Sequence, residues 1–141
     1  MSTITTRTAE ISYNTISRVL TIRLLEGAEL ELADALQNHE ATKMLTNTDH
    51  YLALVDGRVK HLSVSRDARA FAAQSKKEDG CIATALLITS TANKLIGNFY
   101  ININRPNIPT KIFSTEDKAI EWLQESLYLT ESKRPVLSNN Y

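Results

Sequence analysis

The chain has 141 residues, with 16 Lys and Arg against 16 Asp and Glu, so its formal net charge is zero. This balance argues against a nucleic-acid-binding protein, which uses a basic excess to neutralise phosphates. It also gives no attraction to an acidic membrane surface. The single cysteine, Cys81, excludes a disulfide within these residues and a cysteine metal cluster.

The two ends of the sequence are polar, and the part between them suits one domain. The start, MSTITTRTAEIS, lacks the basic and apolar regions of a secretory signal, and no run of about 18 apolar residues occurs. We therefore expect a cytoplasmic protein without membrane insertion. The domain is expected over residues 9–127, with flexible termini at 1–8 and 131–141.

The first half of the chain predicts a hairpin, a helix and a buried strand. The hairpin strands are expected at residues 9–13 and 18–25, where VLTIRL alternates between apolar and polar. A helix is predicted over 30–47, with Leu32, Ala35, Leu36 and His39 on one face. Since Ala41, Met44 and Leu45 fall on a different face, this helix either touches the protein on two sides or ends earlier. Residues 51–55 form a compact apolar run, which is typical of a strand covered on both faces.

The second half predicts helices alternating with single strands. A helix is expected from Ser65, a strand over 81–89, a second helix capped by Ser90 or Thr91, a strand over 110–113 and a final helix over 115–127. The buried stripe of the second helix is expected at Leu95, Ile96, Phe99 and Ile103. The order β-β-α-β-α-β-α-β-α predicts an α/β fold with a mixed, mostly parallel sheet and an N-terminal hairpin.

Gly97 interrupts the second of these helices, at a cost of about 1 kcal/mol relative to Ala. Close packing of the helix against a neighbour is the usual reason for such a glycine. That neighbour is either the sheet or a second subunit. The second alternative would make the protein a homodimer, with Asn98 and Tyr100 beside the contact.

The polar turn between the buried strand and the next helix is the candidate site. Two serines, Ser63 and Ser65, are flanked there by Asp56, His61 and Arg66. A strand-to-helix junction presents hydroxyls and backbone N–H groups together at a sheet edge, which suits a phosphate or a protein partner.

Each residue of this turn also has a purely structural interpretation. Ser65 is either the N-cap of the helix or a phosphorylation site, whose phosphate would meet the free N–H groups of that helix. Asp56 is either a ligand contact or a turn former with Gly57. His61 is either a titratable group of the site or an exposed loop residue.

No other pattern in the sequence points to catalysis or to a cofactor. His39, His50 and His61 are scattered, without the spacing of a metal site. Cys81 precedes a buried apolar run, and the glycines are isolated, so neither a nucleophile nor a phosphate-binding loop is expected. We expect a protein that is not an enzyme and holds no metal or cofactor.

The blocks VLTIRLLEGAELEL, LVDGRVKHLSVSRDAR and ITSTANKLIGNFYININRPNIPTKIFSTEDKAIEWL resemble the small STAS-like proteins, whose fold is that of the SpoIIAA-type anti-sigma-factor antagonists. In that family a serine at the start of the helix after the third strand is phosphorylated by a partner kinase, which breaks their complex. The resemblance places Ser65 at that position. Of the family's Asp-Ser-Ser-Gly motif, the sequence Ser63, Val64, Ser65, Arg66 keeps only this serine.

The resemblance implies a non-enzymatic protein-interaction module that takes part in partner switching. Its partner would be an anti-sigma factor or a kinase-like regulator. The alternative is a small-ligand domain that binds a lipid or a nucleotide in a cavity between the sheet and a movable helix. The residues expected to line that cavity are Leu32, Leu36, Phe71 and Phe99.

Overall fold

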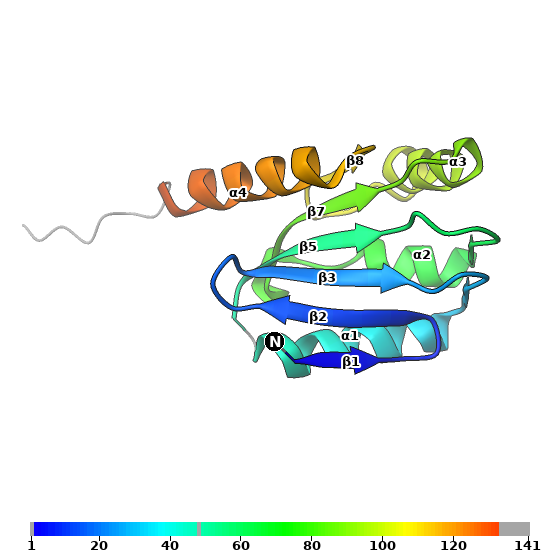
Figure 1. Ribbon diagram of the computed structural model, residues 1–141, viewed down its shortest axis with the longest axis horizontal. Helices are drawn as coiled ribbons and strands as arrows, with labels where there is room; N and C mark the ends of the chain where they lie inside the picture. The colour runs from blue at the N-terminus through cyan, green and yellow to red at the C-terminus, as the bar shows by residue number, and fades with distance from the viewer. Residues whose placement is uncertain (1, 48, 133–141) are drawn as a thin grey trace, which may run out of the picture.

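The computed structural model describes residues 2–47 and 49–132, which form a six-stranded sheet with helices on both faces (Figure 1). The strands are β1 (Thr3–Thr5), β2 (Ala9–Asn14), β3 (Val19–Leu24), β4 (Glu29–Leu30), β5 (Tyr51–Asp56), β6 (Ser63–Val64), β7 (Cys81–Leu87) and β8 (Thr110–Phe113). The helices are α1 (Leu32–Thr46), α2 (Arg66–Ala73), the 3-10 helix η1 (Lys77–Asp79), α3 (Thr91–Phe99), the π-helix η2 (Tyr100–Asn104) and α4 (Glu116–Ser132).

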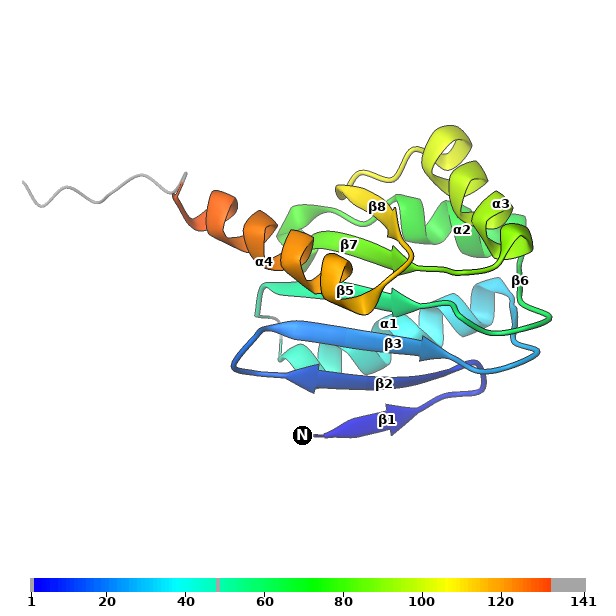
Figure 2. The same cartoon turned by 45° about the horizontal axis from the view of Figure 1, so that its top comes forward.

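The sheet has the order β1-β2-β3-β5-β7-β8, which confirms the predicted α/β fold. β1, β2 and β3 pair antiparallel, and β3, β5, β7 and β8 pair parallel. The parallel connections all step across the sheet in the same direction. Because such crossovers are right-handed, α1, α2 and α3 are placed on one face. The last helix, α4, returns over the other face, in front of β5 and β7 in Figure 2.

The sheet is buried on both faces, and the central strand shows this directly. Along β5, Ala53 belongs to the cluster on the α1–α3 side, whereas Leu52 and Leu54 belong to the cluster under α4. Successive strand residues point to opposite faces, so a strand covered on both sides is apolar throughout. On the α4 side, the predicted inward residues Ala119 and Leu123 are fully buried.

The predicted apolar face of α1 is wrong for its two leucines, whereas Ala35 and His39 are half-buried and line a cavity. Leu32 and Leu36 are 40% and 45% exposed, whereas the buried residues of this helix include Asp34, Asn38 and Thr42. The helix thus turns a largely polar side toward the rest of the protein. Its amino-acid pattern contains too few apolar residues on one face to decide its orientation by hydrophobic burial alone.

Polar partners from the N-terminal segment explain this orientation. The Arg7 guanidinium donates from Nε to Asp34 Oδ1 (2.8 Å). Asn38 donates from Nδ2 to Thr8 Oγ1 (3.1 Å) and accepts from Thr6 Oγ1 (2.6 Å). Buried polar groups are stable only when they are hydrogen-bonded. Arg7, Thr8 and Thr6 provide the hydrogen-bond partners of the buried Asp34 and Asn38.

Within the segment predicted from the sequence to be a flexible terminus, the described residues 2–8 form a strand and bonds to α1, and Met1 lies outside the described residues. β1 pairs with β2 along Thr3–Thr5, and the partly buried Ile4 packs against the core. The Thr6 hydroxyl bonds the backbone of the following turn, where it accepts from Ala9 N (3.1 Å). The segment is therefore held by strand pairing and by its bonds to α1, which its polar composition did not reveal.

The predicted buried stripe of the third helix is also wrong in part. Leu95, Phe99 and Ile103 are 67%, 47% and 64% exposed, and the buried residues of α3 are Asn93 and Gly97. The regular helix ends at Phe99 and continues as a single π-helical segment. Segments of this kind occur often at functional sites.

Gly97 explains why α3 lies so close to the sheet. A Cβ atom at this position would lie 3.0 Å from Cδ1 of Ile88 and 3.0 Å from Cδ1 of Ile112. Of the two neighbours considered for Gly97, the structure therefore shows the sheet. Asn93 fixes the same helix from its first turn, because its Nδ2 donates to the carbonyls of Gly57 (2.9 Å) and Val59 (2.8 Å).

The final helix is longer than predicted. It continues to Ser132 rather than ending at residue 127, so residues 131 and 132 of the predicted tail are helical. The rest of that tail, residues 133–141, lies outside the described residues. Among the described helices, none has the length and apolar character required to cross a membrane.

Candidate functional site

The segment that leads from β6 into α2 holds three of the predicted site residues. Ser65 is the N-cap of α2, because its Oγ accepts from the backbone N–H of Ala68 (3.1 Å). Its own backbone N–H donates to the carbonyl of Leu30 (2.8 Å). Ser63 in β6 and Arg66 at the start of α2 are exposed on either side of it. The capping interpretation of Ser65 is therefore confirmed.

Asp56 lies on a different part of the molecule. Its buried carboxylate forms two hydrogen bonds with the Arg58 guanidinium, from Nε to Oδ1 (2.9 Å) and from Nη2 to Oδ2 (2.9 Å). These bonds lower the pKa of Asp56. With Arg23 and Glu116 it lines a groove of about 360 Å³ on the α4 side of the sheet. The structure does not bring Asp56 together with Ser65.

His61 lies in the exposed loop before β6, with a left-handed backbone (φ 59°). Of the predicted site residues, only Ser63, Ser65 and Arg66 thus share one short surface segment. Their arrangement leaves a hydroxyl and a guanidinium open to solvent beside a capped helix.

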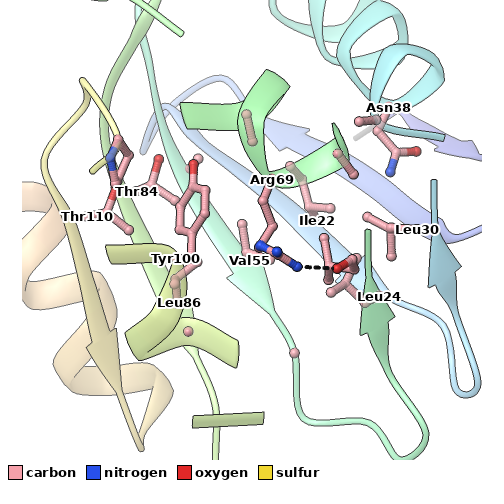
Figure 3. A pocket seen from close by; sticks show the side chains of 18 of the residues that line it. Ile22, Leu24, Leu30, Asn38, Val55, Arg69, Thr84, Leu86, Tyr100 and Thr110 are labelled. Carbon is pink, nitrogen blue, oxygen red and sulfur yellow. Dashed lines mark hydrogen bonds between the residues drawn. The ribbon is translucent and has the colours of Figure 1, made fainter. Parts of the chain in front are cut away.

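A cavity of about 280 Å³ lies between the sheet and the helices α1, α2 and α3, with η2 at one side (Figure 3). Its wall is mainly apolar and comes from strands, from loops and from helices. The aliphatic side chains on it include Ile22, Leu24, Leu30, Val55, Leu62 and Leu86. Small residues of the helices, among them Ala35, Ala68 and Ala72, leave the space open.

Several polar side chains on the wall are already bonded within the fold. Asn38 and Asn93 have the partners described above, and the Thr42 hydroxyl donates to the carbonyl of Asn38 (2.9 Å). The Thr110 hydroxyl donates to the carbonyl of Ile108 (2.8 Å). These groups hold the wall in place and have little capacity left for a ligand.

Arg69 projects from α2 into the cavity (Figure 3). Its Nη1 donates to the carbonyl of Val64 (2.6 Å), and its Nε donates to Oδ1 of Asn104 in η2 (3.3 Å). The guanidinium carbon lies 4.9 Å from the centre of the Phe99 ring, which is a cation–π distance. The side chain is half-buried and held by three elements.

Tyr100 and Cys81 also face this space, as do Tyr51 and His39. Burial raises the pKa of Tyr100 to about 12, so its hydroxyl stays protonated near neutral pH. Burial likewise raises the pKa of the Cys81 thiol. Cys81 is therefore a neutral core residue without the thiolate character that a nucleophile needs.

The sequence predicted a cavity in this place but most of its lining incorrectly. Of the four residues expected, Phe71 lines the cavity, whereas Leu32, Leu36 and Phe99 do not. Arg69 and Tyr100 were not identified as cavity residues. The available signal for Arg69 was its place as a charged residue on a helix whose other cavity-lining residues, Ala68, Phe71 and Ala72, are uncharged.

Within the ranges 2–47 and 49–132, no group of three or more His, Cys, Asp or Glu side chains is placed to hold a metal ion. The candidate site is therefore a mainly apolar cavity with the guanidinium of Arg69 at its wall. Such an arrangement can enclose a small molecule and orient one polar end of it.

Comparison with known proteins shows the family and the fold. The family model described as a domain of unknown function, DUF7793, matches residues 13–127. No curated protein matches the chain. A crystal structure of an uncharacterised DUF3478 family protein from Shewanella loihica PV-4, with a SpoIIAA-like fold, has a TM-score of 0.57 and 16% identity, covering 82% of this chain and 91% of that chain.

This structural similarity confirms the predicted SpoIIAA-like fold. Because the sequence identity is low, it shows the fold and nothing about function. A protein of unknown function from Arthrobacter sp. FB24 is 27% identical, over 80% of this chain and 96% of that chain, with a TM-score of 0.31.

Proposed function

The chain belongs to the DUF7793 family, whose function is unknown. We propose that it binds a small, mainly apolar molecule in the cavity between the sheet and α1, α2 and α3. The role is binding rather than catalysis. The observation that carries the proposal is the cavity itself, with its aliphatic wall and few unbonded polar groups.

The space of about 280 Å³ between the sheet and the helices is partly open to solvent, and most of its lining is apolar. Apolar surface in contact with water is unfavourable, so an apolar ligand that covers this surface would be stabilised. Small-molecule sites occupy roughly 300–1,000 Å³ and are lined by apolar side chains with a few placed polar groups. The cavity is near the lower end of this range, which supports a small ligand.

The proposal is tested by filling the cavity. Val55 faces it from the central strand β5, so Val55→Phe places a ring in the space that a ligand would occupy. We expect the affinity for a neutral fluorescent probe, N-phenyl-1-naphthylamine, to fall at least about tenfold, which corresponds to roughly 1.4 kcal/mol. Probe titration with wild-type protein and the variant measures this.

Thr21→Phe is the matched control, because Thr21 lies on the neighbouring strand β3 and faces the groove on the other side of the sheet. It adds the same ring outside the cavity and should bind the probe as the wild type does. Equal probe affinity in Val55→Phe and wild type would contradict the proposal. A co-purified small molecule in native mass spectra of the wild type would support it directly.

We also propose a second function, regulated docking of a protein partner at the segment around Ser65. The exposed Ser63 and Arg66 beside the capping Ser65 favour it. A phosphate on Ser65 would lie at the positive N-terminus of α2 and close to Arg66. The partner would be an anti-sigma factor or a kinase-like regulator, as in the partner switching of SpoIIAA-type proteins.

The test of this second function is capture of partners from the native cell with wild-type protein and with Ser65→Asp. A kinase-like or sigma-regulating partner that binds one form and not the other supports it. If neither form retains such a partner, the docking proposal fails, and the cavity proposal is unaffected.

A further inference from the structure

Resting on the proposed ligand-binding function, we propose that the cavity takes a small anionic amphiphile, a monocarboxylate with an aliphatic chain, whose carboxylate pairs with Arg69. The chain would lie against the aliphatic wall, and the head group would lie at the guanidinium. The ligand class follows from two observations: Arg69 has no carboxylate partner among the described residues, and the cavity wall around it is mainly aliphatic.

Among the described arginines, Arg69 alone combines partial burial with the lack of a carboxylate partner. Carboxylates pair with Arg7, Arg18, Arg23 and Arg58. Of the arginines that the structure describes, those without a carboxylate partner are Arg66, Arg69 and Arg105, and the first and last of these are exposed. Arg69 is thus a half-buried cation without an anion.

A charge withdrawn from water is unfavourable unless it is paired. Arg69 has partial compensation from the Val64 carbonyl and the Asn104 side chain, both of which are neutral acceptors. A guanidinium carries more donors than these two bonds use, and it binds a carboxylate best through two parallel N–H groups. A ligand carboxylate would supply the missing charge.

The geometry of Arg69 is fixed before any ligand binds. The ring of Phe99 stacks against its guanidinium, and bonds to β6 and η2 hold its position. An ordered donor loses little conformational entropy when it forms a new bond, which favours its use as a head-group site. The hydroxyl of Tyr100 is a further donor on the same wall and, among the described residues, has no hydrogen-bond partner (Figure 3).

The charge of the wall selects one class of anion. The basic residues that line the cavity are one arginine and one histidine, His39, whose ring packs edge-on against Phe71, and the lining includes no lysine. A nucleotide carries several negative charges on its phosphates and would need more than one cation beside them. One carboxylate on one guanidinium leaves the site neutral. The aliphatic wall then favours an alkyl chain as the rest of the ligand.

The experiment measures the affinities of octanoate, octan-1-ol and acetate for the wild-type protein by isothermal titration near neutral pH, where the acids are ionised. Octanoate and octan-1-ol share the chain and differ in the charge, whereas acetate has the charge without the chain. We expect octanoate to bind at least about tenfold more tightly than octan-1-ol, and acetate not to bind.

Arg69→Gln should abolish the preference for octanoate while keeping the affinity for octan-1-ol, which also shows that the variant is folded. The matched control is Arg66→Gln, on the same helix and exposed, and it should behave as the wild type does. If Arg69→Gln fails to fold, the ratio of affinities in the wild type decides the question alone.

The outcomes separate the two proposals. Equal binding of octanoate and octan-1-ol to the wild type would overturn the carboxylate inference and leave the cavity function standing. Acetate binding as tightly as octanoate would also overturn it, because the site would then bind an anion without a chain. If neither octanoate nor octan-1-ol binds, the proposed ligand-binding function fails as well.

Discussion

Ser65 shows how one side chain at a helix start can have a structural role that is distinct from any regulatory one. Its hydroxyl accepts from the N–H of Ala68, one of the donors that an α-helix leaves without a partner at its first turn. This bond exists in the unmodified protein and requires no partner. The capping role can therefore be measured without reference to phosphorylation.

Ser65→Ala should lower the free energy of unfolding by about 1 kcal/mol, the usual contribution of an N-cap serine. Ser63→Ala is the control, because Ser63 is exposed in the short strand β6, and its change should stay within about 0.5 kcal/mol. Urea denaturation of the three proteins measures both values. Equal stability of Ser65→Ala and wild type would show that the cap contributes nothing.

The role of Ser65 was predictable from the sequence, whereas the surroundings of Asp56 were not. A cap depends on residues within one turn of the same helix, so its pattern is local. The carboxylate of Asp56 pairs with Arg58, two residues later in the chain. Asp56 lies on the face of the sheet opposite α2 because its side chain, at the end of β5, points to the α4 side. A shift of a strand by one residue reverses that direction.

At the scale of elements, α1 has the clearest disagreement between amphipathic pattern and packing. Leu32 and Leu36 are exposed, and the buried side consists largely of polar residues, two of which bond to the N-terminal segment. One helical wall of the cavity is therefore formed around a hydrogen-bonded polar face. The position of this helix depends on a segment more than twenty residues earlier in the chain.

Asn38→Ala should destabilise the protein by about 1–3 kcal/mol, because it leaves the buried hydroxyl of Thr8 without its partner and removes one of the bonds of the Thr6 hydroxyl. Met44→Ala on the same helix removes a larger apolar side chain, but Met44 is 74% exposed, so its cost should be below about 0.5 kcal/mol. Chemical denaturation checks the order of the two. A larger loss in Met44→Ala would contradict the observed orientation of α1.

At the scale of the whole molecule, the two faces of the sheet are covered by different helices. The right-handed crossovers place α1, α2 and α3 on one face, where the cavity lies, and α4 packs over β5 and β7 on the other face, beside the groove that Asp56 lines. A ligand in the cavity would contact the sheet and the three helices at once. Its binding should therefore stabilise the entire fold.

A ligand present at about 100 times its dissociation constant stabilises the native state by about 2.7 kcal/mol. For a domain of this size, the midpoint of thermal unfolding should then rise by roughly 5–10 °C. We expect this shift for wild type with octanoate at that concentration, and a shift of about half that size or less for Val55→Phe, whose affinity should be at least about tenfold weaker. Calorimetric scans with and without octanoate measure it, and an equal shift in both proteins would place the binding site elsewhere.

The sequence by itself determined the fold class, the order of the main elements, the strand buried on both faces and the cap of α2. These features follow from periodicity and from contacts between near neighbours in the chain. Only the tertiary structure decided the face of α1, the pairing of β1, the side of α3 that packs at Gly97 and the exposure of Leu95 and Phe99.

The sequence predicted a candidate site at the turn around Ser65. The structure shows a cavity near this turn, with the guanidinium of Arg69 at its wall. A cavity is the space left between elements that are distant in sequence, so no local pattern specifies it. The missing partner of Arg69 is likewise a property of packing, since a carboxylate elsewhere in the chain could have reached it in another fold. Local preferences fix elements, and only their assembly decides which groups remain unpaired.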